Sequence, residues 1–158
     1  MTKAESAYEL FKAAIGESDG AGDWLVVDQA RIDAFADVTE DHQFIHVDPK
    51  LAAEVSPWGV TIAHGFLTLS LLVKLCESIP QRADRLDGVV MGINYGFDKV
   101  RFINPVKVDS RIRASSVLSG VELKDPSTIQ VTRTVTVEIE NESKPALVAE
   151  WLSRIIYG

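Results

Sequence analysis

The chain has 158 residues, 46% hydrophobic and 25% charged, which is ordinary for one globular domain with a sizeable core. Its formal net charge is −7 and it has no block of lysine or arginine, so a nucleic-acid partner is not expected. No run approaches the ~20 apolar residues of a membrane span, and the single Cys76 permits no internal disulfide, so we expect a cytoplasmic protein with no membrane partner.

The N-terminal part of the chain predicts a helix, a loop and a short strand. Apolar residues at helical spacing predict a helix over residues 4–15, and the small and polar run "DGAGD" (19–23) predicts a loop after it. The segment "WLVVD" (24–28) is typical of a short strand. We therefore expect an N-terminal helical extension over residues 1–22 and one domain over residues 23–158.

Two helices with capped starts are expected next. Asp28 has a side chain suited to capping a helix that ends near Thr39. Asp48 followed by Pro49 gives another helix an acceptor side chain and a proline at its first position. The acidic segment between the two helices, "EDHQFIHVDP" (40–49), has weak helical character and is expected to be a loop.

The segment "GFLTLSLLVKLCES" (65–78) predicts the central helix of the fold. It is apolar on nearly every side, and such a helix is normally surrounded by the rest of the protein. Pro80 closes the segment. We therefore expect a continuous helix that is buried all round.

The second half of the chain changes to strand periodicity. Its β-branched residues fall in four long segments, and the third segment alternates between apolar and polar residues, as in a strand with one covered face. The expected strands are residues 88–106, 109–123, 127–140 and 145–157. They predict an α+β fold in which an antiparallel sheet curls around the buried helix.

The acidic segment concentrates side chains that can carry chemistry. Asp41, His42, His46 and Asp48 are all suitable metal ligands, but the segment lacks an HExxH pattern, so no metal is expected. A polar turn, in which Asp41 caps a backbone group and His46 is a core residue, is a second interpretation. A third is a carboxylate and an imidazole that together hold one water and move its protons.

Two features ahead of the central helix favour the proton-transfer interpretation. His64 lies in a second short polar break, "TIAHG", and Gly65 leaves bare backbone N–H groups at a helix N-terminus, where they can hold a negative oxygen. Asp41 and His46 are placed to converge on a water, and Gln43 adds a neutral hydrogen bond. The residues therefore indicate acid–base chemistry on a bound water near an oxyanion site.

The two segments together resemble the signature of the MaoC-like, (R)-specific enoyl-CoA hydratases. That signature runs Asp, any residue, Asn, Pro, Ile or Leu, His, any residue, Asp, and a His-Gly pair follows after a spacer; this chain has "DHQFIHVD" and "IAHG". The later "NYGFDKVRFINPVKVDSRIR" resembles the sheet segment of the same family. Gln43 stands where the family commonly has asparagine, and Phe44 stands where it has proline. These departures concern the range of substrates more than the reaction.

The resemblance implies a single hot-dog domain, in which a long central helix is wrapped by an antiparallel β-sheet. It implies that Asp41 and His46 are the catalytic pair, that the backbone N–H of Gly65 binds the thioester carbonyl and that Gln43 contacts the substrate. For His64 we expect a structural role, in which its side chain bonds a backbone carbonyl and so holds the Gly65 turn. Family members with one such domain usually pair with their sheets joined edge to edge, so a homodimer is expected.

The implied reaction is the reversible hydration of a trans-2-enoyl-CoA to a (3R)-hydroxyacyl-CoA, which is a hydro-lyase reaction of fatty acid metabolism. Water held between Asp41 and His46 would add at C3, and a proton would be delivered to C2 from the same side. The sequence leaves open which of the two residues is the base. Arg101 is the candidate contact for the CoA phosphates, and no cofactor beyond the CoA of the substrate is implied.

Two other functions fit parts of the sequence. A hot-dog thioesterase would direct water at the carbonyl carbon and usually relies on an Asp or Glu on or near the central helix, where this chain offers only Glu77, near the far end. A non-catalytic acyl-thioester-binding subunit of a dehydratase would not need the catalytic pair. The presence of both Asp41 and His46 favours the hydratase.

Overall fold

The computed structural model describes all 158 residues as one six-stranded sheet with seven helices. The strands are β1 (Ser18–Ala21), β2 (Leu25–Val27), β3 (Val89–Phe102), β4 (Ser110–Asp125), β5 (Thr128–Ile139) and β6 (Leu147–Tyr157). The helices are α1 (Lys3–Ala13), α2 (Gln29–Thr39), α3 (Phe44–Val47), α4 (Pro49–Val55), α5 (Gly65–Ser70), α6 (Leu72–Cys76) and α7 (Ala83–Leu86). None of these helices has the length and apolar character needed to cross a membrane.

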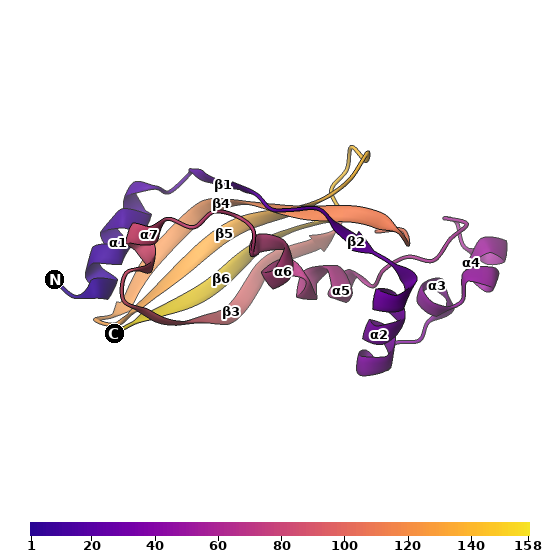
Figure 1. The fold of residues 1–158 in the computed structure, drawn as a ribbon, viewed down its shortest axis with the longest axis horizontal. Helices are drawn as coiled ribbons and strands as arrows, with labels where there is room; N and C mark the ends of the chain where they lie inside the picture. The colour runs from indigo at the N-terminus through magenta and orange to yellow at the C-terminus, as the bar shows by residue number, and fades with distance from the viewer.

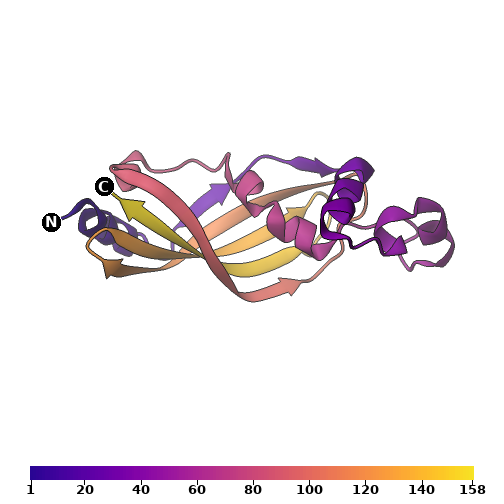
Figure 2. The same ribbon diagram turned by 90° about the horizontal axis from the view of Figure 1, so that it is seen from below.

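Every strand pairing in the sheet is antiparallel, in the order β1-β4-β5-β6-β3, and β2 also pairs with β4. The strand β3 therefore has only one neighbour and forms an edge of the sheet. Figure 1 shows α5 and α6 against the sheet, with α2, α3 and α4 beyond one end and α1 and both termini at the other. Figure 2 shows the strong twist of the sheet beneath the central helices. The four expected long strands and the antiparallel sheet are confirmed.

The main core lies between the central helices and the sheet. Leu72 and Leu75 of α6 belong to one buried cluster with Val135, Val137 and Leu147 of the sheet. Burying each such side chain contributes about 1.5–3 kcal/mol. On β5, the apolar residues of the expected alternation are all buried, as a strand with one covered face requires.

A second buried cluster fixes the N-terminal helix to the far end of the sheet. Ala7 and Phe11 of α1 pack with Leu118 of β4 and with Ile129 and Val131 of β5. Thr2 caps this helix by accepting from the Glu5 N–H, and the Glu5 carboxylate accepts from the Thr2 N–H in return. The expected helix is therefore confirmed as an element that packs on the sheet.

The expectation of a continuous central helix that is buried all round is wrong. The helix is divided into α5 and α6 at Leu71, although Leu71 N–H still donates to the Leu67 carbonyl at 3.0 Å. The Ser70 hydroxyl donates to the Phe66 carbonyl at 2.7 Å, a side-chain bond that commonly bends helices. The side chains of Phe66 and Val73 are 66% and 58% exposed. One face of the central helix is therefore left uncovered by this chain.

Other differences concern short segments. The residues of "DGAGD" were expected to be a loop, but β1 begins at Ser18 and pairs with β4. The cause is Asp19, whose carboxylate accepts from the Ser116 hydroxyl at 2.7 Å and from Arg133 Nε at 3.1 Å. The acidic segment contains the one-turn helix α3 instead of a simple loop, and α7 was not expected. The domain boundary at residue 22 stays a prediction.

Candidate active site

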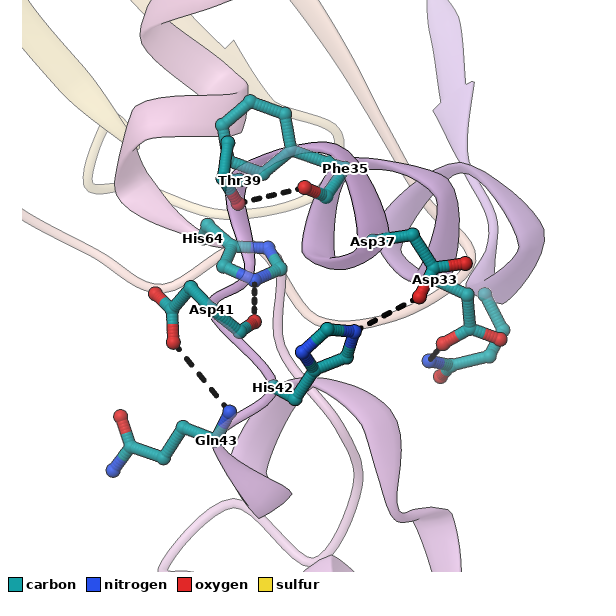
Figure 3. A network of polar contacts seen from close by, with 9 residues as sticks. Asp33, Phe35, Asp37, Thr39, Asp41, His42, Gln43 and His64 are labelled. Atoms are coloured by element: carbon teal, nitrogen blue, oxygen red, sulfur yellow. Dashed lines mark hydrogen bonds and ion pairs between the residues drawn. The ribbon is translucent and has the colours of Figure 1, made fainter.

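Asp41 lies in the exposed loop that joins α2 to α3. The Asp28 carboxylate caps the start of α2 by accepting from the Arg31 N–H at 2.9 Å, as expected. The helix ends at Thr39, and Glu40 turns the chain through a left-handed conformation with φ of 59°. The Asp41 carboxylate accepts a long hydrogen bond, 3.4 Å, from the Gln43 N–H (Figure 3). This carboxylate therefore remains open to solvent and to a ligand.

His46 is held on α3 by contacts on both its backbone and its ring. The His46 carbonyl accepts from the Gln29 side-chain amide of α2 at 2.7 Å. Its ring is buried, and Nδ1 lies 2.7 Å from the Ile62 carbonyl oxygen. Because a carbonyl oxygen can only accept, Nδ1 carries the proton and Nε2 has the free lone pair. The Ile62 N–H donates in return to the Ile45 carbonyl at 2.9 Å, which locks α3 to the next segment.

The surroundings of His46 favour its neutral form. Burial is the largest cause and lowers its pKa, while the hydrogen bond to the Ile62 carbonyl raises it. The neighbouring His64 lowers the pKa further, and Asp41 raises it. The net result is a pKa below the ordinary 6.5. At neutral pH, His46 is therefore an uncharged imidazole with an available lone pair.

His64 connects the two residues. Its ring is almost fully buried, and Nε2 donates to the backbone carbonyl of Asp41 at 3.0 Å (Figure 3). The His64 and His46 rings are stacked, with centroids 3.8 Å apart and planes at 23°. One carboxylate oxygen of Asp41, one ring nitrogen of His46 and one ring nitrogen of His64 lie within 4.8 Å of one another. The structure therefore brings His64 together with Asp41, which lies 23 residues before it in sequence, and with His46.

Next to this group, a cavity of about 240 Å³ opens between α5 and the end of β3. His46 is the only ionisable residue that lines it. Most of the wall is apolar, with Ile62, Phe102 and Val106 among its residues. Such a cavity suits an apolar chain whose polar head reaches His46.

Gly65 also lines this cavity, at the first position of α5. Its N–H has no acceptor within the helix, because the residues that would accept it precede the helix. The turn before it is held by backbone bonds, in which Leu67 N–H and Thr68 N–H both donate to the His64 carbonyl, at 3.0 Å and 3.2 Å. The His64 side chain bonds a backbone carbonyl, as expected, and that carbonyl belongs to Asp41.

Two acidic-segment residues take no part in this group. His42 Nε2 lies 2.9 Å from an Asp37 carboxylate oxygen and is half exposed (Figure 3). The Asp48 carboxylate accepts from the Leu51 N–H at 2.9 Å and caps α4, as expected. The four-residue metal set considered from the sequence is therefore not assembled.

The remaining cluster of Asp41, His46 and His64 is a poor match to a metal site. His46 Nδ1 and His64 Nε2 donate to carbonyl oxygens, so the nitrogens left to ligate an ion are His46 Nε2 and His64 Nδ1. The two rings are nearly parallel, whereas tetrahedral ligands must point at one centre. The ligand atoms of the three residues lie up to 4.8 Å apart. This separation suits groups that share a water, because two hydrogen-bond partners of one tetrahedral water lie roughly 4.5–4.8 Å apart.

Three predicted site residues lie outside the cavity wall: Asp41, which reaches only the His46 side of the site, Gln43 and Arg101. Gln43 is exposed and contributes its N–H to Asp41. Arg101 is exposed at the end of β3, and its guanidinium donates to the Val100 carbonyl at 2.7 Å. Neither lines the cavity, although Phe102, the neighbour of Arg101, does. Their proposed roles stay predictions.

Sequence reasoning missed three residues of the site. Thr68 and Asn104 line the cavity, and the Thr68 hydroxyl has no hydrogen-bond partner in the protein. Gln29 holds the His46 carbonyl and also accepts from the Thr61 hydroxyl at 2.5 Å. Thr68 follows Gly65 by three residues, so helical periodicity placed it on the same face. No sequence signal marked Asn104 or Gln29.

Comparisons with known proteins agree with this arrangement. A family model described as a "MaoC like domain" matches residues 11–141. "Nodulation protein N" of Rhizobium leguminosarum bv. viciae is 52% identical over 142 residues, covering 89% of this chain and 86% of that protein. "3-hydroxyacyl-thioester dehydratase Z" of Mycobacterium tuberculosis is 48% identical over 156 residues and 99% of both chains.

A solved structure extends the likeness to the fold. The (R)-hydratase from A. caviae involved in PHA biosynthesis superposes with a TM-score of 0.68 over 88% of this chain and 94% of that one, at 23% identity. At this identity, the likeness establishes the fold alone. Together with the family match over most of the chain, it shows that the protein is a member of the MaoC-like dehydratase family with the hot-dog fold.

Proposed function

We propose that the protein catalyses the reversible hydration of trans-2-enoyl-CoA to (3R)-3-hydroxyacyl-CoA. The observation that carries the proposal is that a neutral imidazole, His46, lines a largely apolar cavity, with a ligand atom of the Asp41 carboxylate within 4.8 Å of a nitrogen of its ring. The name of the mycobacterial relative describes a dehydratase of 3-hydroxyacyl thioesters, which is the reverse reaction. The acyl chain would lie along the apolar wall, with the thioester carbonyl at the Gly65 N–H.

The geometry suggests which group is the base. In the hydration direction, His46 Nε2 takes a proton from the water while the water oxygen forms a bond to C3. The electron pair of the C2=C3 double bond moves onto the thioester carbonyl, and the Gly65 N–H stabilises the resulting enolate oxygen. The imidazolium then gives its proton to C2 on the same face, which restores His46 and the carbonyl.

Asp41 has a supporting role in this mechanism. Its carboxylate accepts a hydrogen bond from the water and orients the oxygen toward C3. During the reaction, it also lies close to the transient imidazolium of His46, and an opposite charge at this distance favours the charged form. We propose that the reaction requires no metal and no cofactor beyond the CoA of the substrate, so activity should be unchanged by a chelator.

The thioesterase alternative has less support. The acid available to it, Glu77, lies beyond the end of α6, is exposed and is paired with Lys74. It does not line the cavity that holds His46 and Gly65. A water directed at the carbonyl carbon from Glu77 would therefore be separated from the candidate oxyanion donor.

A homodimer is the proposed form of the protein. The edge strand β3 has 14 residues, no neighbour on its outer side, and exposed apolar side chains that include Met91, Ile93 and Tyr95. A long apolar edge of this kind is a template for pairing with another strand. The uncovered side chains Phe66 and Val73 add to the apolar surface. Joining two copies at β3 would cover part of this surface and complete the sheet.

The experiment that tests the proposed function mixes purified protein with crotonyl-CoA. We expect the enoyl-thioester absorbance to fall without release of free thiol, and we expect Asp41→Asn to abolish the reaction. His42→Gln is the matched control, because His42 is in the same loop but outside the site. Release of thiol would identify a thioesterase. The absence of any reaction with short and long enoyl-CoA would favour a non-catalytic binding subunit.

A further inference from the structure

The side chain of His64 touches both proposed catalytic residues but does not line the cavity. It reaches Asp41 through a hydrogen bond to the backbone carbonyl, 3.0 Å long, and it reaches His46 by ring stacking at 3.8 Å. Phe35 of α2 packs on His64 as well, with ring centroids 4.9 Å apart. A residue with these contacts can act on the reaction only through the groups that it holds.

The loop that carries Asp41 has few other ties. Within residues 40–43, the Asp41 carboxylate has only the long bond from the Gln43 N–H, and His42 bonds back to Asp37 of the preceding helix. The bond from His64 is therefore the contact that fixes the backbone of Asp41 to the segment ahead of α5. Figure 3 shows the His64 ring pointing at this carbonyl, while the Asp41 carboxylate points away toward Gln43.

The stacked ring fixes the other partner. His46 is anchored at Nδ1 by the Ile62 carbonyl, but one hydrogen bond leaves the ring free to swing about it. The His64 ring, nearly parallel to it at 23°, limits that motion. Shifting a reacting group by about 1 Å can cost a hundredfold in rate.

We propose that His64 is a positioning residue, which sets the separation of Asp41 and His46 by bonding the backbone of one and stacking on the ring of the other. This inference rests on the proposed hydration reaction. It assigns to His64 a role in the rate of the chemical step and none in substrate binding. A role limited to filling the core would require only a side chain of similar size.

Two substitutions separate these roles. His64→Phe keeps a ring that can stack but removes the donor to Asp41, whereas His64→Gln keeps an N–H at a similar reach. We expect His64→Phe to fold, to lower kcat by at least about tenfold and to leave KM nearly unchanged. We expect His64→Gln, which keeps the donor but loses the stacked ring, to be less impaired in kcat than His64→Phe. A His64→Phe enzyme with unchanged kcat, or a His64→Gln enzyme as impaired as His64→Phe, would overturn the proposal.

A second readout does not depend on activity. The chain has three histidines, so the imidazole nitrogens of protein labelled with ¹⁵N-histidine can be assigned with the His42→Gln and His64→Gln variants, each of which removes one set of signals. We expect opposite tautomers, with the proton on Nδ1 in His46 and on Nε2 in His64. A His64 protonated on Nδ1 alone would overturn the proposal. If wild-type protein does not hydrate crotonyl-CoA and these tautomers are found, the proposed function has failed but the contact between His64 and Asp41 has not.

Discussion

Gly65 and Phe102 are packed so closely that a Cβ atom on residue 65 would lie 2.9 Å from Cγ of the Phe102 ring. Real Cβ atoms essentially never approach another atom this closely, so any larger residue at position 65 must displace the ring. Both residues line the cavity beside His46. The glycine of the family motif is therefore required by the position of a side chain on β3.

Gly65→Ala should lower activity more than stability. The Phe102 ring is half exposed and can move, but its movement changes the shape of the cavity next to the residue 65 N–H. Alanine keeps the backbone N–H, so we expect kcat/KM for crotonyl-CoA to fall by at most about a hundredfold, which is the cost of losing an oxyanion donor outright. The double variant Gly65→Ala/Phe102→Leu should recover part of this loss. Gly120→Ala is the control, because its new Cβ would be 3.7 Å from Thr132. Full activity in Gly65→Ala would contradict this role.

Asp41→Asn and His46→Gln should both lower kcat by about a hundredfold or more, because each removes a group that holds the water. Their effects on stability should differ. Asp41 is exposed, so Asp41→Asn should leave the melting temperature unchanged. His46 is buried and bonded to the Ile62 carbonyl, so its replacement should cost about 1–3 kcal/mol. The two variants differ in this way because His46 lies on the helix α3, whereas Asp41 lies in the loop before it. Thermal melts and steady-state kinetics check both points.

The pH dependence of kcat/KM should report His46. Its pKa is lowered below 6.5, chiefly by burial, and the proposed mechanism needs the neutral form. We therefore expect kcat/KM to be constant around neutral pH and to fall in acid with an apparent pKa below 6.5. If kcat/KM instead falls with an apparent pKa above 6.5, a group other than His46 is titrating.

The free energy of unfolding should depend on pH through the same residue. As pH falls through 6.5, His46 takes up a proton in the unfolded chain before it does so in the folded protein. The stability associated with neutral His46 is therefore fully present above pH 6.5 and is lost as pH falls below it. Measuring the free energy of unfolding against pH checks this, because it should fall less steeply in acid for His46→Gln than for wild-type protein.

Arg101→Ala should distinguish recognition of the CoA phosphates from recognition of the acyl chain. If the exposed guanidinium binds phosphate, KM for crotonyl-CoA should rise several-fold, while a crotonyl-pantetheine thioester, which lacks the nucleotide phosphates, should be unaffected. Arg111→Ala, which removes an exposed arginine paired with Glu140, is the matched control. Equal effects of Arg101→Ala on both substrates would show that this residue does not contact the nucleotide.

The oligomeric state should depend on β3. Ile93→Lys places a charge on the uncovered edge strand, where lysine commonly prevents edge-to-edge pairing. We expect wild-type protein to elute as a dimer and the variant as a monomer in size-exclusion chromatography with light scattering. Val117→Lys is the control, because this exposed residue lies on β4, which has neighbours on both sides. A wild-type monomer, or a variant that remains dimeric, would contradict the proposed interface.

The main strands and caps could be predicted from sequence because the signals are local. The alternation of apolar residues along β5 and the acceptor side chains at Asp28 and Asp48 each depend only on neighbouring residues. The strand β1 could not be predicted in this way. Asp19 holds it through Ser116 and Arg133, which are 97 and 114 residues away along the chain. The division of the central helix at Leu71 was also missed, because an apolar pattern does not show how the neighbouring Ser70 hydroxyl will bond.

The candidate site shows the same division. Asp41, His46 and Gly65 were found because they belong to two short segments with a recognisable spacing. The contact between His64 and Asp41 was not found, because it depends on how two loops meet. Asn104 reaches the cavity from the segment after β3, which was expected to continue as strand. That segment includes Pro105, which has no N–H to donate to a sheet.

The most direct test of the central claim uses the two enantiomers of 3-hydroxybutyryl-CoA, each incubated separately with wild-type protein and with Asp41→Asn. We expect wild-type protein to form crotonyl-CoA from the (3R) enantiomer alone, without release of thiol, and we expect the variant to form none. Formation of crotonyl-CoA from the (3S) enantiomer, or equal activity in Asp41→Asn, would contradict the assignment of the reaction to Asp41 and His46.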